Sequence, residues 1–516
     1  MHSDQIKKLY ELRGSDPQKA LVVQEELGDS PQENQVKAIV LIDAGELLRD
    51  IASVSRGVEI LKLLKQNEYF SPENSYNLAN GLQVRGRLNH DKMNPHSGSS
   101  FEDRFEARQE FGEVMNMSGA SSKTKSQAST NIGILLLETE RWVEALYYFK
   151  HATAFFPTNS VAAFQEMRYL MGFLQLYLKE KERYNSYSHI DPLVNRIKSL
   201  ATLISENYDV IEEFSGPQAL ETVRKVTDDA LKLTKVPNPS LTNKYFEFIR
   251  KNDLALSLYS SFEEYEKGKF DLLRLASVSY GFSNKFEVPE IFAMINIIIS
   301  DYAFARQVFY EAQYDDKETI FYETSDHNDR LDYALYGVQF SALTTAQRIA
   351  FDILDKIAVA IGVYLEIPKA SKIDFTKLWG QAKKGKGFVV RPEIEKELQA
   401  GNSGLIALYN MFSDISKDQS RGNGFLEAHK RYRHSTTHRF TVLHDETLAE
   451  WDSTSNSIEH ESIEKFEALT LMSLKLSKAA LFYFVDAINF HEDRKLSDII
   501  SIASTVPSHD YIRGRK

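Results

Sequence analysis

The residues best suited to chemistry gather in one short segment, residues 425–444, which carries four histidines and four cations within twenty residues. These are His429, His434, His438, His444, Lys430, Arg431, Arg433 and Arg439. Only one acid, Glu427, offsets them, whereas the whole chain is acidic with a formal net charge of -11. Concentrated positive charge on an acidic protein predicts a docking site for a polyanion such as RNA.

Within this segment, Arg433 is followed by a polar residue and, five positions later, by His438. An arginine and a histidine are residue types that suit metal-free RNA cleavage. This reaction needs a base that takes the 2′-hydroxyl proton, an acid that protonates the leaving 5′-oxygen and a cation that stabilises the charge of the transition state. Imidazole suits both proton transfers because its pKa of about 6.5 lies near neutral pH. A guanidinium holds two phosphate oxygens and stays charged. On a regular helix, a spacing of five residues leaves two side chains about 140° apart around the axis, so Arg433 and His438 do not share one face.

Other interpretations of these residues stay open. His434 and His438 are four apart, the spacing of two metal ligands on a helix face. No acid lies between them as in the zinc peptidases, so we predict no metal and no cofactor. Arg433 and His438 could also bind RNA without cutting it. We expect His429 and His444 to be buried or capping histidines.

Composition narrows the class of protein. A chain of 516 residues is too long to form a single ordinary hydrophobic core, so two or more folded units are expected. Its content of 42% hydrophobic and 26% charged residues is typical of a soluble globular protein. The absence of cysteine excludes disulfides, cysteine nucleophiles and thiolate zinc sites. The longest apolar run, residues 291–299, is about half of what a bilayer requires. Because no secretory signal is evident either, we expect a cytoplasmic protein without a membrane partner.

The first half of the chain shows a helical repeat. Residues 126–157 fit the roughly 34-residue tetratricopeptide (TPR) pattern, in which a small residue lets two helices approach. The residues at the pattern's offsets are Gly133, Ala145, Phe149 and Pro157. Weaker copies begin near residues 39 and 76. We therefore expect residues 1–280 to form a TPR-like α-solenoid, whose groove binds an unknown protein or peptide ligand.

The second half has fewer and longer helices, expected over 291–313, 332–366, 404–412 and 457–490. Their apolar stripes predict an antiparallel helical bundle over residues 285–495, followed by a C-terminal tail at 496–516. We found no run of alternating apolar residues that predicts a strand. The predicted fold class is all-α.

This bundle resembles the HEPN superfamily (higher eukaryotes and prokaryotes nucleotide-binding), whose motif is Arg, often a polar residue, and a His four to six residues after the Arg. Arg433, His434 and His438 occupy these three places. Many members carry an acidic residue and other polar groups on the preceding helix, and the nearest candidates are Asp352, Asp355 and Lys356. The layout looks like a branch of HEPN proteins fused to TPR arrays. The resemblance covers residues 285–495 and 30–160.

The resemblance implies a metal-independent endoribonuclease whose products end in 2′,3′-cyclic phosphate. It also implies a homodimer, in which two bundles bring two copies of the motif to one cleft. We assign His438 as general base or acid, Arg433 as transition-state stabiliser and His434 as a residue that orients the phosphate. Candidates for RNA binding are Lys430, Arg431, Arg439, Lys356 and Asp355.

A defence or stress role, such as an anti-phage toxin, is what the resemblance implies for the whole chain. The repeat region would then sense a partner and release the bundle to cut RNA. The alternative is a non-catalytic TPR scaffold whose bundle dimerises or binds RNA.

Overall fold

The structure is a computed structural model that describes residues 2–67, 71–89, 99–236, 243–260, 271–275, 278, 289–313, 321–328, 333–383, 387–418, 422–445 and 457–496. The chain divides into two compact units. Unit 1 comprises Met1–Tyr169 and Ser199–Lys232, and unit 2 comprises Leu170–Lys198 and Leu233–Lys516. The predicted boundary near residue 280 stays a prediction, since residues 279–288 lie outside the described chain. The tail beyond residue 496 also lies outside it.

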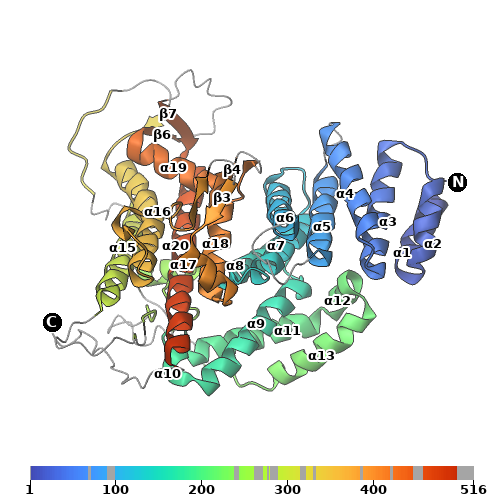
Figure 1. Cartoon of the computed structure of the whole chain (residues 1–516), viewed down its shortest axis with the longest axis horizontal. Coiled ribbons are helices and arrows are strands. Elements are labelled where there is room, and N and C mark those ends of the chain that lie inside the picture. The colour runs from blue at the N-terminus through green and yellow to red at the C-terminus, as the bar shows by residue number, and fades with distance from the viewer. Residues whose placement is uncertain are drawn as a thin grey trace. The chain divides into compact units, whose positions relative to one another are not determined.

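Unit 1 is helical, and its helices up to α8 follow one another in a row (Figure 1). They are α1 (His2–Ser15), α2 (Pro17–Val23), a 3-10 turn (Gln24–Glu26), α3 (Pro31–Leu48), α4 (Ile51–Gln66), α5 (Pro72–Leu88), α6 (Ser99–Asn116), α7 (Ser122–Leu137), α8 (Trp142–Phe155), α12 (Tyr208–Ser215) and α13 (Pro217–Leu231). Helices α9 (Ser160–Lys179) and α11 (Ile190–Glu206) each begin in one unit and end in the other.

Three consecutive helical hairpins, α3/α4, α5/α6 and α7/α8, pack one on the next in unit 1. Small residues let their helices approach, as the repeat pattern predicts. A Cβ on Gly133 would lie 2.5 Å from the ring of Phe149, and one on Gly57 would lie 2.8 Å from the carbonyl oxygen of Ala38. The array is consistent with helical repeats, and its assignment to the TPR type stays a prediction.

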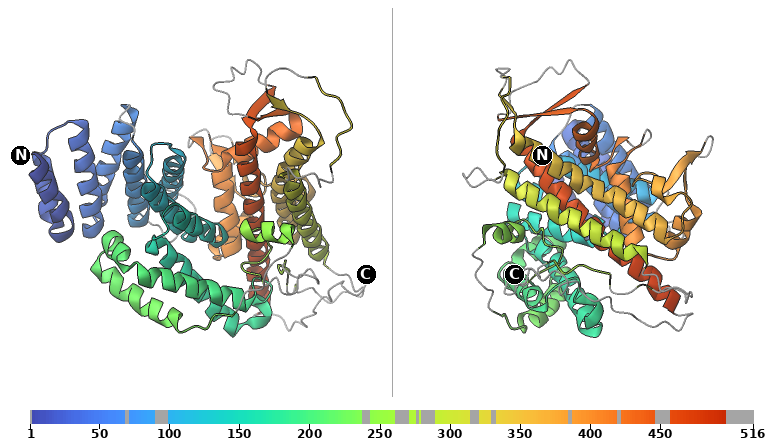
Figure 2. Two further views of the ribbon diagram at one scale, coloured as in Figure 1. Left: turned by 180° about the vertical axis from the view of Figure 1, so that it is seen from behind. Right: turned by 90° about the vertical axis from the view of Figure 1, so that its left-hand side faces the viewer.

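Unit 2 contains the long helices. They are α10 (Lys181–Tyr184), α14 (Lys244–Lys251), α15 (Glu290–Gln313), α16 (Val338–Tyr364), a 3-10 turn (Ala370–Lys372), α17 (Pro392–Gln399), α18 (Ser403–Ile415), α19 (Glu427–His438) and α20 (Ile463–Leu496). Helix α20 packs against α15, α16 and α18 (Figure 2). Leu481–Val485 are all fully buried, so α20 is covered on every side at its centre.

Short strands, which the sequence analysis did not predict, accompany the helices. They are β1 (Ala334–Leu335), β2 (Gly380–Lys383), β3 (Gly387–Val390), β4 (Lys417–Asp418), β5 (Gly422–Asn423), β6 (Phe440–His444) and β7 (Ile458–Ser462). Strand β6 pairs antiparallel with β1 and parallel with β7, while β2/β3 and β4/β5 are two-stranded. The charged segment 425–444 therefore divides into a helix and a strand. The all-α class is confirmed, because these strands are short additions to helices.

Helix α16 begins at Val338, later than the predicted residue 332. Gly337 precedes it with φ of 118°, a conformation that favours glycine, and Ala334–Leu335 pair with β6 instead of extending the helix. Within the described ranges, two helices, α15 and α20, are long and apolar enough to cross a membrane by length and composition. In α20, 72% of the most apolar window is buried inside the protein, as expected of a core helix.

Candidate active site on helix α19

Helix α19 lies on the bundle through one buried stripe. Leu426, His429, Tyr432 and Ser435 recur every three residues, and all are buried. The ring of Tyr432 meets that of Phe466 on α20 edge to face, with centroids 5.8 Å apart. Because α19 is anchored along this stripe, Arg431 and His434 are exposed, whereas Arg433, four residues after His429, lies beside the stripe and next to α16.

Arg433 is held by two carboxylates from α16, an arrangement called here the Arg433 clamp. Its Nε donates to Oδ1 of Asp352 at 2.9 Å, and its Nη2 donates to Oδ2 of Asp355 at 2.8 Å. The two aspartates are three residues apart and therefore lie on one face of α16. The Arg433 side chain is 31% exposed, so the clamp orients a guanidinium that solvent still reaches.

The clamp uses two of the five N–H donors that a guanidinium carries. Asp355 is fixed in turn, because its Oδ1 accepts the backbone N–H of Phe375 at 2.8 Å. Burial raises the pKa of the Asp355 carboxyl, opposed by this N–H and by Arg433. The clamp therefore places one cation beside two acids, so the three side chains together carry no net positive charge.

A chain of polar contacts joins α19 to the core of the bundle. The Thr436 hydroxyl donates to Oε1 of Gln347 at 3.3 Å, and Nε2 of Gln347 donates to the carbonyl of His429 at 3.3 Å. Nδ1 of His429 lies 2.8 Å from the hydroxyl of Ser473 on α20. Burial lowers the pKa of His429 to about 4. His429 is therefore neutral near pH 7 and positions the helix, as its predicted burial implies.

Strand β7 sets two acids against α19. Nη1 of Arg431 lies 2.9 Å from Oε1 of Glu459, and its guanidinium sits 4.9 Å from the ring centroid of Tyr432. The hydroxyl of Tyr432 donates to Glu461. The sequence pattern did not indicate these two acids. Their spacing of two residues puts them on one face of a strand, a signal that becomes useful only once the strand is recognised.

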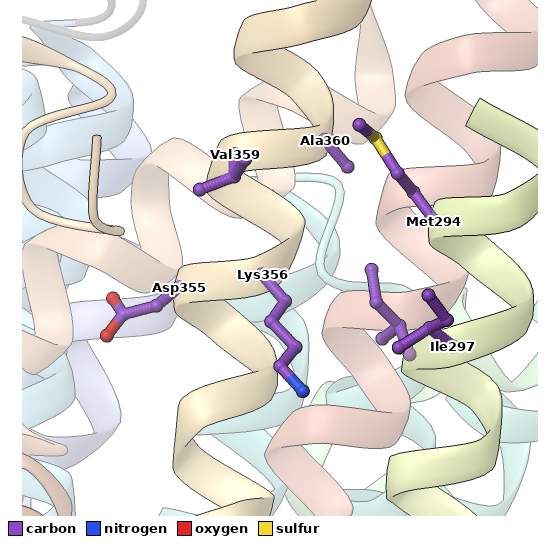
Figure 3. Close-up of a pocket in the computed structure, with 7 residues that line it drawn as sticks. Met294, Ile297, Asp355, Lys356, Val359 and Ala360 are labelled. Atoms are coloured by element: carbon purple, nitrogen blue, oxygen red, sulfur yellow. The ribbon is translucent and has the colours of Figure 1, made fainter. Parts of the chain in front are cut away.

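The remaining predicted RNA-binding residues scatter. Lys430 reaches the hydroxyl of Thr376 at 3.5 Å, and Arg439 is exposed just after α19. Lys356 pairs with Asp301 of α15 and points away from Asp355, as Figure 3 shows. The structure thus brings Asp355 to Arg433 and leaves Lys356 on another side of α16.

The two motif histidines occupy different positions on α19. His434 is exposed, one residue after Arg433. His438 is the last residue of the helix, and its side chain lies outside the described part of the structure. The arrangement of Arg433 with His438 therefore stays a prediction. His444, on β6, is buried and its Nε2 lies 2.9 Å from Nδ1 of His460, as expected of a structural histidine.

Residues 282–491 match the LA2681-like HEPN family, so this part of the chain is an HEPN-family domain. The matched residues run from the start of α15 to near the end of α20. They include Arg433, Asp352 and Asp355, which form the Arg433 clamp. No curated protein and no solved structure matches the chain.

Proposed function

We propose that the HEPN-family domain is a metal-independent endoribonuclease in which Arg433, His434 and His438 carry the chemistry. The observation that supports this most is the Arg433 clamp. Two ion pairs hold the Arg433 guanidinium in one orientation, and the residue that follows it, His434, is exposed. Fixed cations are what stabilise charge that develops in a transition state.

In the proposed reaction, His438 takes the proton of a ribose 2′-hydroxyl. The 2′-oxygen then bonds to the adjacent phosphorus, the bond from phosphorus to the 5′-oxygen breaks, and a 2′,3′-cyclic phosphate remains. A protonated imidazole supplies the proton that the leaving 5′-oxygen needs, and in a homodimer the second copy of the motif provides it. Each such proton transfer contributes about 10²–10⁴-fold to the rate.

Arg433 would hold the scissile phosphate, while His434 would orient it. Asp352 and Asp355 repel RNA, so the attraction must come from cations farther along α19, of which Arg431 and Lys430 are the nearest in sequence. Arg431 is already paired with Glu459 at 2.9 Å. RNA that binds here would exchange this carboxylate for a phosphate, which is a modest cost for a half-exposed pair.

For the whole chain we propose a toxin-like defence or stress effector, controlled by unit 1. Its support is the stack of helical hairpins, an architecture whose surface commonly binds protein or peptide partners. The alternative is a scaffold whose bundle dimerises or binds RNA without cutting it, which would leave the Arg433 clamp a structural feature.

The test is cleavage of labelled RNA by the purified full-length chain in EDTA, with the variants Arg433→Ala and His438→Ala. We expect the wild type to cut and each variant to lose about 10²-fold or more of the rate. Arg87→Ala is the matched control, because Arg87 is also a half-exposed arginine paired with a carboxylate, Glu46. Equal rates for all four proteins would support the scaffold. Loss of wild-type cleavage in EDTA would contradict the metal-free mechanism.

A further inference from the structure

An exposed aromatic residue follows the motif directly. Phe440 is the first residue of β6 and leaves 69% of its surface accessible. It comes two residues after His438, so the two Cα atoms are at most about 7 Å apart. Arg439, between them, is also exposed. A proposed catalytic imidazole, a cation and an open ring therefore follow one another where α19 ends.

The two faces of β6 and β7 have different surroundings, because successive side chains of a strand point to opposite sides. Strand β6 lies against α19 (Figure 1). The hydroxyl oxygen of Thr441 lies 3.0 Å from that of Ser435 on α19. Glu459 and Glu461 of β7 also reach side chains of α19. These contacts define an inner face, and Phe440 belongs to the opposite one, called here the outer face.

The outer face is apolar at its open end. Its members are Phe440, Val442 and His444 of β6 and Ile458, His460 and Ser462 of β7. The parallel register places the three residues of β6 beside the three of β7. None of the six is acidic, since both glutamates of β7 face α19. Exposure decreases along β6 from Phe440 to the buried His444, so the open end of the face is the one next to His438.

A second ring adjoins this face. Strand β1 runs antiparallel to β6, and Leu335 is paired with an inner-face residue of β6. Tyr336 comes next, toward the Phe440 end, and alternation places it on the outer face. It is 38% exposed, and its ring stacks on that of His327 with centroids 5.9 Å apart. The three-stranded sheet thus carries two exposed aromatic rings on the side away from α19.

We infer that the outer face is a stacking platform for unpaired bases of the RNA, and that Phe440 receives a base next to the scissile phosphate. Aromatic rings exposed on a protein surface hold single-stranded RNA because every base has a π-face that can stack on them. Bases in a duplex are paired and stacked on their neighbours, so they do not reach the ring. The platform therefore restricts the site to unpaired RNA without reading its sequence. This inference rests on the proposed ribonuclease function, because it concerns the nucleotides at the phosphate that is cut.

Position and charge favour RNA over a protein as the ligand of this face. RNA that places a phosphate at His438 brings a neighbouring base within reach of Phe440, since these residues are about 7 Å apart. The phosphates meet no carboxylate among the outer-face residues of β6 and β7, and Arg439 adds a cation at the edge. A protein ligand would have no reason to prefer the end beside the motif.

Binding of a single-stranded 2′-O-methyl RNA to the full-length chain tests the platform, because this RNA lacks the hydroxyl that cleavage needs. We expect Phe440→Ala to bind about 5- to 150-fold more weakly, which corresponds to the loss of one base–aromatic stack. Phe440→Leu keeps an apolar side chain without a ring and should bind as weakly, whereas Phe440→Tyr should bind like the wild type. Phe304→Ala is the matched control, since Phe304 of α15 is also exposed, at 55%, and should bind like the wild type. Wild-type affinity in Phe440→Ala or Phe440→Leu would overturn the inference.

Two properties of the loss distinguish stacking from a disturbed cationic site. The slope of log K against log salt should be the same for Phe440→Ala and the wild type, because the ring carries no charge. The same RNA annealed to its complement should bind both proteins equally, because its bases do not reach the ring. A smaller slope, or an equal loss on the duplex, would contradict the stack.

A strand with a single ribose among deoxyriboses identifies the stacked base, because only the phosphate after that ribose can be cut. An abasic site replaces, in turn, each of the two bases that flank this phosphate, and cleavage is measured below KM. For one of the two positions, the wild type should lose the same factor that Phe440→Ala loses, and Phe440→Ala should lose nothing further. If the two losses multiply at both positions, the ring and the base act independently and the inference fails.

These measurements also separate the inference from the proposed function. A wild type that binds 2′-O-methyl RNA through Phe440 but cuts no RNA would contradict the ribonuclease and leave the platform standing. A wild type that cuts single-stranded RNA no faster than Phe440→Ala does, below KM, would contradict the platform and leave the ribonuclease standing.

Discussion

Arg433 differs from the other cations of α19 because its orientation is set by α16. A lone exposed arginine samples many rotamers, and holding it costs side-chain entropy of about 1.5–2 kcal/mol. Here Asp352 and Asp355 fix the guanidinium before any substrate arrives. If Arg433 stabilises a transition state, the aspartates are positioning residues that act through it.

We therefore predict that Asp355→Asn slows RNA cleavage by about 10²-fold, because a misplaced catalytic group can cost that much. The asparagine oxygen can still accept the N–H of Phe375, so the fold should persist. Binding of RNA should stay unchanged or tighten, since a negative charge is removed. Cleavage and binding measured separately on the two proteins check this. An equal loss in both would indicate a structural defect.

The contribution of Asp355 to the cleavage rate should depend on pH. Burial raises the pKa of Asp355, so this carboxyl gains its proton at a higher pH than an ordinary aspartate. Below that pKa the group is neutral and its ion pair with Arg433 is lost. The cleavage rate of the wild type should therefore fall toward that of Asp355→Asn as the pH decreases, and the ratio of the two rates should approach one.

The family resemblance singled out Arg433 and His434 and offered Asp352, Asp355 and Lys356 as candidates to face them. The structure places the two aspartates at Arg433 and pairs Lys356 with Asp301 of α15 instead. The sequence did not indicate Glu459, which reaches Arg431 from β7. That contact depends on a parallel pairing of β6 with β7, which joins residues almost twenty positions apart. A five-residue strand between two helices carries too few positions for alternation to indicate it.

At the scale of elements, the bundle depends on a close approach of α18 to α20. A Cβ on Gly404 would lie 2.2 Å from the carbonyl oxygen of Tyr483 and 2.3 Å from the backbone nitrogen of Ala487. Asn402, just before α18, donates to the carbonyl of Ala487 at 3.1 Å and so closes the same contact. The sequence predicted both helices, but nothing in it shows that Gly404 faces α20.

Gly404→Ala should lower the free energy of unfolding of the bundle by about 1–3 kcal/mol, because the backbones of α18 and α20 must move apart. Gly172→Ala is the matched control. Gly172 lies inside α9, and a Cβ there meets nothing within 4 Å. Helix propensity predicts a gain of about 0.5–1 kcal/mol from this second change. Thermal unfolding of the two variants should shift in opposite directions. A Gly404→Ala protein as stable as the wild type would contradict the contact.

At the scale of the whole molecule, unit 2 includes a segment from well before the predicted boundary near residue 280. Residues 170–198 belong to it. The link is made by buried Tyr187, whose hydroxyl donates to Oδ1 of Asp486 at 2.6 Å and accepts from Nδ2 of Asn489 at 3.2 Å. Arg183 adds an ion pair to Asp493 at 2.6 Å. A contact across about 300 residues leaves no local pattern in a sequence, which is why helical periodicity did not indicate it.

This link predicts that Tyr187→Phe loosens α20 without affecting unit 1. The change keeps the ring, which lies 5.7 Å from that of Phe482, but removes the hydroxyl that both Asp486 and Asn489 use. Burial keeps the Tyr187 pKa well above its ordinary value, so the hydroxyl is a donor at every physiological pH. Its loss should cost about 1–3 kcal/mol.

Amide hydrogen exchange of the full-length chain measures this by segment. In Tyr187→Phe, exchange in α20 and at the start of α11 should accelerate by about 5- to 150-fold, the range that corresponds to this free energy, while α3 and α4 stay as in the wild type. Tyr184→Phe, in the same cluster of rings, leaves the Tyr187 hydroxyl in place and should leave α20 protected. If α20 exchanges at the wild-type rate in both variants, the bundle of residues 282–491 is stable without the segment before it. The family match would then mark the limits of an independent folding unit.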